Sequence, residues 1–103
     1  MDLEVELANA QAFLDGGLRR VRLYGGLVRH KRITLAGLAV VLAHETGHHL
    51  GGTPHLQYYR WLSSEERANE WAKTVGLQVV FGRVTAGIIW TRGTKELKKI
   101  GSN

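Results

Sequence analysis

The stretch Leu42–Gly52 places three histidines and one glutamate in a largely apolar segment. His44 and His48 are four residues apart, so in an α-helix they lie on one face, one turn from each other. Thr34 is a suitable N-cap upstream, and Gly51 with Gly52 is a strong helix end. We therefore predict a helix of about four turns between these residues, supported by apolar residues that recur at helical spacing in its first half, namely Leu35, Leu38, Val41 and Leu42.

The same helix predicts a metal site. Zinc takes neutral imidazole nitrogen and leaves a coordination position open, which suits His44 and His48. Glu45 lies next to His44, where its carboxylate can reach a metal-activated water and act as general base in hydrolysis. The alternative is a buried helix whose histidines are satisfied by backbone or water. Four polar groups on an apolar helix favour the metal, because unpaired polar groups are costly to bury.

A catalytic zinc site needs a third protein ligand, and two residues are candidates. His55 comes close to the metzincin pattern H-E-x-x-H-x-x-G-x-x-H, in which Gly51 matches the glycine. Pro54, however, occupies the third histidine position, so His55 is one residue out of register. Glu65 is the other candidate, with Asn69 one helical turn later, an arrangement seen in gluzincins in which the second residue orients a ligand. Acidic residues are also common in the first turn of a helix, which is the structural explanation for Glu65.

The combination A-H-E-x-G-H-H, followed by S-x-E-x-x-A-N-x-W-A, resembles small gluzincin-type zinc metallopeptidases. The resemblance is to the ImmA/IrrE-like family and to minigluzincins, and it covers about residues 20–75. It implies an α+β, zincin-like fold with an N-terminal helix, a small sheet with a substrate-facing edge strand, an active-site helix and a second helix that carries a glutamate ligand. It also implies a site with one catalytic Zn²⁺, the ligands His44, His48 and Glu65, and the catalytic base Glu45.

The resemblance extends to the surroundings of the zinc. Asn69 would orient a ligand, although many relatives have Asp at that position. The edge strand that pairs with a peptide substrate matches residues 19–24, so the substrate-binding residues would be Arg22, Leu23 and Tyr24. An oxyanion donor is also needed, and the linker that follows the motif offers His55, Tyr58, Tyr59 and Arg60.

These residues predict a zinc-dependent peptidase that cleaves peptide or protein substrates. Zinc would lower the pKa of a water toward about 7 while Glu45 removes its proton. The alternative is a catalytically weak zinc-containing regulatory or binding module, acting on a repressor or on nucleic acid through a basic face. Basic residues do gather before the motif, but no nucleic-acid-binding signature accompanies them, so we expect no nucleic-acid binding.

The remaining segments predict the other elements. Apolar residues at helical intervals predict a helix over 2–14 that ends at Gly16 and Gly17, and alternation predicts a strand over 18–24. Residues 27–33 read as extended or irregular chain. A capping box formed by Ser63 and Glu66 starts a helix that Gly76 interrupts. Residues 77–90 favour a helix over strands, and the tail from Thr91 is expected to form one short turn.

The bulk properties set the outer limits. A chain of 103 residues is expected to form a single domain, residues 1–103. It has no cysteine, so thiolate zinc sites are excluded. The acidic start lacks a signal-peptide pattern, which predicts a cytoplasmic protein. The longest apolar run, Leu35–Ala43, is too short to span a bilayer. The sequence leaves the oligomeric state open.

Overall fold

A two-residue turn joins the two strands of the structure, a computed structural model that describes residues 10–23, 33–57 and 59–101. The strands β1 (Ala10–Asp15) and β2 (Leu18–Leu23) pair antiparallel, with Ala12 opposite Val21. Both turn residues have positive φ, 57° at Gly16 and 86° at Gly17. Positive φ at both central positions defines the type I′ turn, which glycine adopts without steric cost and which matches strand twist.

This hairpin corrects the predicted N-terminal helix. Residues 10–14 of the predicted helix 2–14 form a strand, and residues 1–9 lie outside the described part of the chain. The two glycines that were interpreted as a helix end are the hairpin turn. Pairing with β2 satisfies the backbone groups of β1 that face that strand, and this long-range partner outweighs a weak helical periodicity. The predicted strand over 18–24 is confirmed for residues 18–23.

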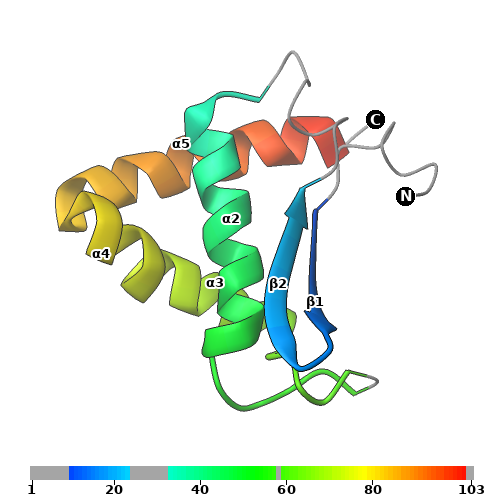
Figure 1. The fold of residues 1–103 in the computed structure, drawn as a ribbon. Helices are drawn as coiled ribbons and strands as arrows, with labels where there is room; N and C mark the ends of the chain where they lie inside the picture. The colour runs from blue at the N-terminus through cyan, green and yellow to red at the C-terminus, as the bar shows by residue number, and fades with distance from the viewer. Residues whose placement is uncertain (1–9, 24–32, 58, 102–103) are drawn as a thin grey trace.

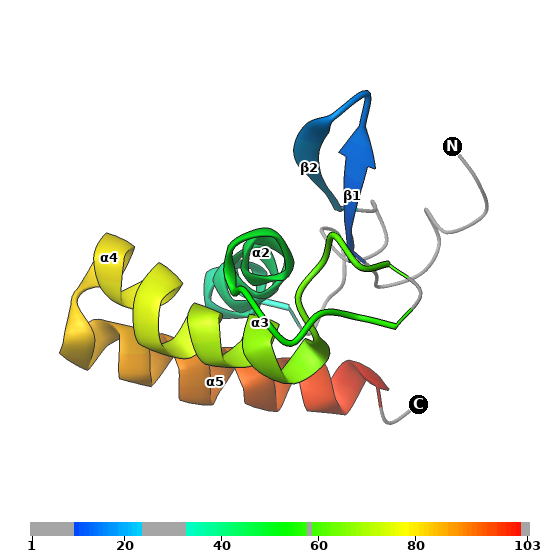
Figure 2. The same ribbon diagram turned by 90° about the horizontal axis from the view of Figure 1, so that it is seen from below.

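The motif helix is present as predicted. The helix α2 runs from Leu35 to Leu50, and the Thr34 side chain accepts a hydrogen bond from the Ala36 backbone N–H at its start. Gly51 forms the C-cap. Figure 2 shows α2 lying between the hairpin on one side and the remaining helices on the other.

A second helical stretch follows a linker. It comprises α3 (Glu65–Trp71), the π-helical segment η2 (Ala72–Gly76) and α4 (Leu77–Phe81), and it ends at Gly82. The prediction that Gly76 interrupts this helix is wrong, because the chain stays helical. A Cβ at Gly76 would lie 2.6 Å from the Trp71 ring, so the absence of a side chain there makes room for packing.

The start of α3 differs from the predicted capping box by one residue. The N-cap is Ser64, whose hydroxyl accepts from the Arg67 backbone N–H at 3.2 Å. Ser63 is instead buried and forms an isolated antiparallel bridge with His55. The predicted capping box of Ser63 and Glu66 is therefore wrong.

The last helix is much longer than predicted. The helix α5 runs from Arg83 to Gly101, so the tail after Thr91 is helical rather than a short turn. It crosses behind α2 in Figure 1 and packs closely against it. A Cβ at Gly93 would lie 2.6 Å from the Ala36 carbonyl oxygen, which shows how closely the two backbones approach. The apolar core lies between these helices and contains Val40, Leu77 and Ala86, with Ala39, Ala43, Ile89, Trp90 and Leu97 packed around them.

One carboxylate ties α5 to the start of α2. Glu96 Oε1 accepts from the Thr34 backbone N–H at 2.9 Å, and Oε2 accepts from the Thr34 hydroxyl at 2.6 Å. Burial raises the pKa of the Glu96 carboxyl, but the hydrogen bonds from Thr34 and the Gly37 N–H, with the charge of Arg92, lower it more. The pKa of Glu96 therefore lies below its ordinary value of 4.5. An anion at this place also complements the helix dipole.

The result is a small α+β fold with a two-stranded sheet and helices. The prediction for residues 27–33 falls almost wholly outside the described residues, as does that for Tyr24. No helix in the described segments is long and apolar enough to cross a membrane.

Candidate metal centre

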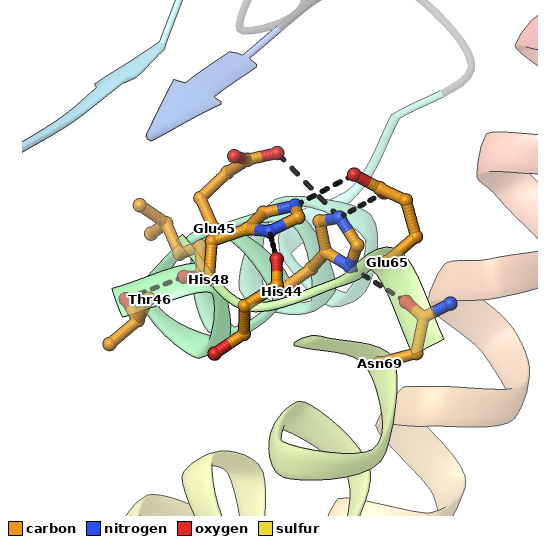
Figure 3. A network of polar contacts seen from close by, with 8 residues as sticks. His44, Glu45, Thr46, His48, Glu65 and Asn69 are labelled. Atoms are coloured by element: carbon orange, nitrogen blue, oxygen red, sulfur yellow. Dashed lines mark hydrogen bonds and ion pairs between the residues drawn. The ribbon is translucent and has the colours of Figure 1, made fainter. Parts of the chain in front are cut away.

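Three side chains of α2 converge at its C-terminal half. His44, Glu45 and His48 offer ligand atoms that all lie within 4.8 Å of one another, a grouping able to hold a metal ion. The two imidazole rings meet edge to face, with centroids 4.7 Å apart and an interplanar angle of 85° (Figure 3). The helical spacing of the motif produces this convergence, as the sequence predicted.

Glu65 joins the group from α3. Its Oε1 lies 3.1 Å from His44 Nε2, and its Oε2 lies 3.0 Å from His48 Nε2. One carboxylate therefore spans both imidazoles, as Figure 3 shows. His55, the other candidate third ligand, is exposed and has its backbone in the bridge to Ser63, and it does not belong to this cluster.

The other nitrogen of each ring faces an oxygen acceptor. His48 Nδ1 donates to the Ser63 carbonyl at 2.7 Å, and His44 Nδ1 donates to Asn69 Oδ1 at 2.7 Å. Because these oxygens accept, the protons sit on the Nδ1 atoms. The Nε2 atoms of neutral rings then point their lone pairs toward Glu65.

In this arrangement the Nε2 lone pairs of His44 and His48 face the carboxylate oxygens of Glu65, so hydrogen-bond acceptors face one another. Two imidazole lone pairs and a carboxylate repel one another unless a proton or a cation lies between them. Zinc ligands at about 2.0–2.1 Å in a tetrahedral site are themselves roughly 3.3 Å apart. The observed N–O separations of 3.0 and 3.1 Å are near that value. The donor set of two imidazole nitrogens and one carboxylate oxygen thus fits a cation such as zinc.

Glu45 lies beside His44, His48 and Glu65 but does not bridge them as Glu65 bridges the two imidazoles. Its Oε2 lies 3.9 Å from His44 Nε2, beyond hydrogen-bond range, and its side chain is 13% exposed. It lines two cavities, one shared with His48 and the other with His44. The carboxylate therefore remains available to a molecule that enters from either side.

The approach of α3 to α2 depends on the glycine inside the motif. A Cβ at Gly47 would lie 2.5 Å from the Ala68 carbonyl oxygen, so any side chain there would push α3 away. Arg67 strengthens the contact by donating from Nε and Nη2 to the Gly51 carbonyl, at 3.1 and 2.9 Å. A cation is favourable at the C-terminal end of α2. Close packing at Gly47 is what brings Glu65 and Asn69 within reach of the histidines.

Ser63 holds His48 from two sides. Its N–H donates to the His48 carbonyl at 2.6 Å, while its own carbonyl accepts from His48 Nδ1. Ser63 was not predicted to be part of the site. The sequence carries no signal for it, because a backbone carbonyl of any residue can play this role.

The third histidine of the motif has a different partner. His49 Nε2 donates to the Arg20 carbonyl at 2.8 Å, and Arg19 Nη1 donates to His49 Nδ1 at 3.3 Å. Both ring nitrogens therefore serve the contact with β2. Arg19 Nη1 also lies 3.1 Å from the Trp61 carbonyl oxygen. His49 anchors the hairpin on α2.

A cavity of about 460 Å³ opens beside the candidate metal ligands. One wall is β1, with Ala10–Leu14, and the base includes Glu45, His48 and Glu65. The linker supplies the opposite wall with Leu56, Tyr59, Trp61 and Leu62. The strand along this cavity is thus β1.

The residues predicted to bind substrate lie on β2. Arg22 and Leu23 are not among the residues that line the cavity, and the Arg22 guanidinium stacks 4.7 Å from the Phe13 ring centre. Tyr24 lies outside the described residues. Among the candidate oxyanion donors, Tyr59 lines the cavity and packs edge to face against Trp61, 5.6 Å between ring centres. Tyr58 also lies outside the described residues.

Comparisons with protein-family models, with curated proteins and with solved structures gave no match to this chain. The site must therefore be interpreted from its own geometry.

Proposed function

We propose that this protein is a zinc-dependent peptidase with a zincin-like site, in which His44, His48 and Glu65 hold one zinc ion and Glu45 is the general base. The observation that carries the proposal is the convergence of two imidazole Nε2 atoms on one carboxylate, at 3.1 and 3.0 Å. Their Nδ1 protons are already committed to other acceptors. A polar cluster with a surplus of acceptors calls for a cation.

The residues around the ligands support this assignment. A zinc-bound histidine commonly donates its other N–H to a carbonyl or carboxylate, which sets the tautomer and the ring orientation. Ser63 does this for His48 and Asn69 does it for His44. When bound, zinc supplies Lewis acidity that activates water and polarises a carbonyl.

Glu45 would move the protons of the reaction. Its carboxylate borders the cavity and lies next to the ligand set, so it can take a proton from the attacking water. The same group can then donate that proton to the leaving amine. A general base contributes about 10²–10⁴-fold to the rate.

The peptide would lie in the cavity between β1 and the linker. Extended peptides are commonly recognised alongside a strand, and the wall formed by Ala10–Leu14 offers such a strand next to Glu45. We therefore assign substrate alignment to β1. The Tyr59 hydroxyl, on the opposite wall, is our candidate donor to the developing oxyanion.

The test combines metal analysis with a peptide library. We expect one equivalent of zinc in the purified protein and cleavage of library peptides by wild type. Glu45→Gln should retain zinc and lower turnover by about 100-fold or more. The control is Glu66→Gln, an exposed glutamate on α3 outside the cluster, which should leave turnover unchanged. Stoichiometric zinc without any cleavage by wild type would instead support a zinc-containing binding module.

A further inference from the structure

One arginine side chain connects three segments of the chain near the cavity beside Glu45. Arg19 of β2 donates from Nη1 to the Trp61 carbonyl oxygen in the linker, at 3.1 Å, and to His49 Nδ1 on α2, at 3.3 Å. The terminal NH₂ group of a guanidinium has two N–H bonds, so a single Nη1 atom can serve both acceptors. Arg19 therefore joins the hairpin to the linker and to the end of α2.

The three segments that Arg19 joins also form the cavity. Leu14 of β1 lines the cavity and lies directly opposite Arg19 in the strand register. Trp61 lines it from the linker, and His48, which precedes His49 in the chain, belongs to its base. Arg19 itself is not among the lining residues. It can therefore hold the two walls in place without contacting a molecule inside the cavity.

The linker wall is attached to α2 at one end. The Leu56 N–H donates to the Leu62 carbonyl, and the Leu62 N–H donates to the Tyr59 carbonyl, both at 2.9 Å, so this part of the linker closes on itself. The Ser63 N–H then fastens it to the His48 carbonyl at 2.6 Å. A loop that is attached at one end can turn about that attachment unless a further contact holds it. The hydrogen bond from the arginine is such a contact, on the side of the hairpin.

We propose that Arg19 is a positioning residue that sets the distance between the two walls of the cavity, and this proposal rests on the peptidase function proposed above. Without the guanidinium, the linker keeps its attachment to α2 but can turn away from β1. A peptide that both walls hold then binds less tightly. A short substrate that reaches only the groups around Glu45 does not depend on the distance between the walls.

The kinetic test compares a long and a short substrate. Displacement of a bound group by about 1 Å can cost about 100-fold in rate, so we expect Arg19→Gln to lower kcat/KM for a long library peptide by about 10–100-fold. Most of this loss should appear as a higher KM, because the walls hold the peptide equally in the ground state and in the transition state. A blocked dipeptide with the same residues at the cleaved bond should keep its KM and kcat. Zinc content should equal that of wild type.

The neighbouring arginine supplies a matched control. Arg20 pairs with Asp15 inside the hairpin, Nε to Oδ2 at 3.0 Å, and its contact with His49 uses the backbone carbonyl, which a substitution retains. Arg20→Gln removes the same charge from the same strand and should leave the KM of the long peptide unchanged. Arg19→Lys keeps a charged donor at the original position and should show a smaller loss than Arg19→Gln. It replaces Arg19→Gln in the test if that variant does not fold.

A distance measurement gives a readout that is independent of turnover. The chain contains no cysteine, so Leu18→Cys on β2 and Gln57→Cys in the linker provide two specific sites for spin labels. Both positions are exposed. Pulsed electron paramagnetic resonance of the zinc-loaded protein should give a narrow distance distribution with Arg19 present. The distribution should become broader and longer with Arg19→Gln and stay narrow with Arg20→Gln.

The outcomes separate this inference from the peptidase proposal. If wild type cleaves no peptide, the peptidase function fails, and the role of Arg19 in it fails too. If wild type cleaves peptides but Arg19→Gln leaves the KM of the long peptide or the distance distribution unchanged, the peptidase function stands and the role of Arg19 is overturned. Equal losses for the long and the short substrate, or loss of zinc, would show that Arg19 only supports the fold, which also overturns the proposal.

Discussion

Two glutamates join α2 to neighbouring helices, and their surroundings are opposite in character. Glu96 of α5 receives hydrogen bonds from the N–H and the hydroxyl of Thr34, at 2.9 and 2.6 Å. Glu65 of α3 faces His44 Nε2 and His48 Nε2, at 3.1 and 3.0 Å, whose protons are on the far side of each ring. The first carboxylate is satisfied by donors of the chain, and the second faces ring nitrogens that can share a cation or a proton with it.

The difference separates a contact that is satisfied within the fold from one that could take a ligand. A carboxylate surrounded by donors stabilises the fold, because each lone pair finds a partner. A carboxylate held against other acceptors costs free energy until a ligand arrives. The contact of Glu96 near the start of α2 therefore belongs to the architecture, whereas the group around Glu65 near the end of α2 could hold a metal ion.

The largest expected effect is the loss of zinc affinity when Glu65, rather than Glu96, is replaced. Glu65→Ala should weaken zinc binding by more than about 100-fold, because it removes a ligand and leaves two histidines. Glu96→Ala should leave zinc affinity nearly unchanged while destabilising the fold. Titration against a competing chelator measures both.

His55→Ala is the control for the alternative ligand. It should bind zinc like wild type, since His55 lies outside the cluster. If His55→Ala loses the metal and Glu65→Ala keeps it, the third ligand is His55 and the assignment of Glu65 is wrong.

The next effect concerns the acceptor that orients His44. Asn69→Leu removes the oxygen at 2.7 Å from His44 Nδ1 and should lower zinc affinity by about 10–100-fold. Asn69→Asp keeps an acceptor and should retain most of the affinity. Equal affinity for wild type and Asn69→Leu in the same titration would show that the Nδ1 contact does not prepare the ring.

A third substitution tests the packing that brings the two helices together. Gly47→Ala forces a Cβ to within 2.5 Å of the Ala68 carbonyl, which should lower the free energy of unfolding by about 1–3 kcal/mol and weaken zinc binding. Gly87→Ala is the matched control on α5, because a Cβ there meets no atom within 4 Å. It should stabilise the protein by up to about 1 kcal/mol. Denaturant unfolding compares them, and equal stability of the two variants would contradict this role of Gly47.

The smallest expected effect is on the pH dependence of stability, and it tests the hydrogen bonds of Glu96. The folded-state pKa of Glu96 lies below its ordinary value of 4.5, so the unfolded chain binds more protons in the intervening pH range. Stability from this group is thus fully present above the ordinary value and is lost as pH falls through the folded-state pKa. Glu96→Gln should cost about 1 kcal/mol at pH 7. The difference from wild type should shrink on acidification, and a difference that stays constant with pH would contradict the hydrogen-bond assignment.

Local signals in the sequence were sufficient for α2 and for part of the site. Thr34 and Gly51 marked the ends of the helix because capping depends on backbone groups only a few residues away. The i, i+4 spacing of His44 and His48 brought their side chains together for the same reason. Glu65 was identified as a candidate by its neighbours in the sequence, and the structure brings it to both imidazoles.

Other features required the tertiary structure. Residues 10–15 have a helical periodicity but form a strand, because their backbone partner is β2. The tail from Thr91 is helical because α5 packs along α2, where Gly93 allows close contact. The contact of Glu96 with Thr34 joins residues 62 positions apart. No local pattern encodes such pairs.

The candidate site shows the same division. The sequence alone identified the residues that we propose to carry the chemistry, since side-chain identity and helical spacing are local properties. Only the tertiary structure decided what each of them faces. The Ser63 carbonyl lies behind His48, and β1 lines the cavity beside Glu45. Trp90 lines the other cavity, which His44 borders. These contacts form between segments far apart in the chain, so their geometry is set by packing of the whole fold rather than by any short stretch of residues.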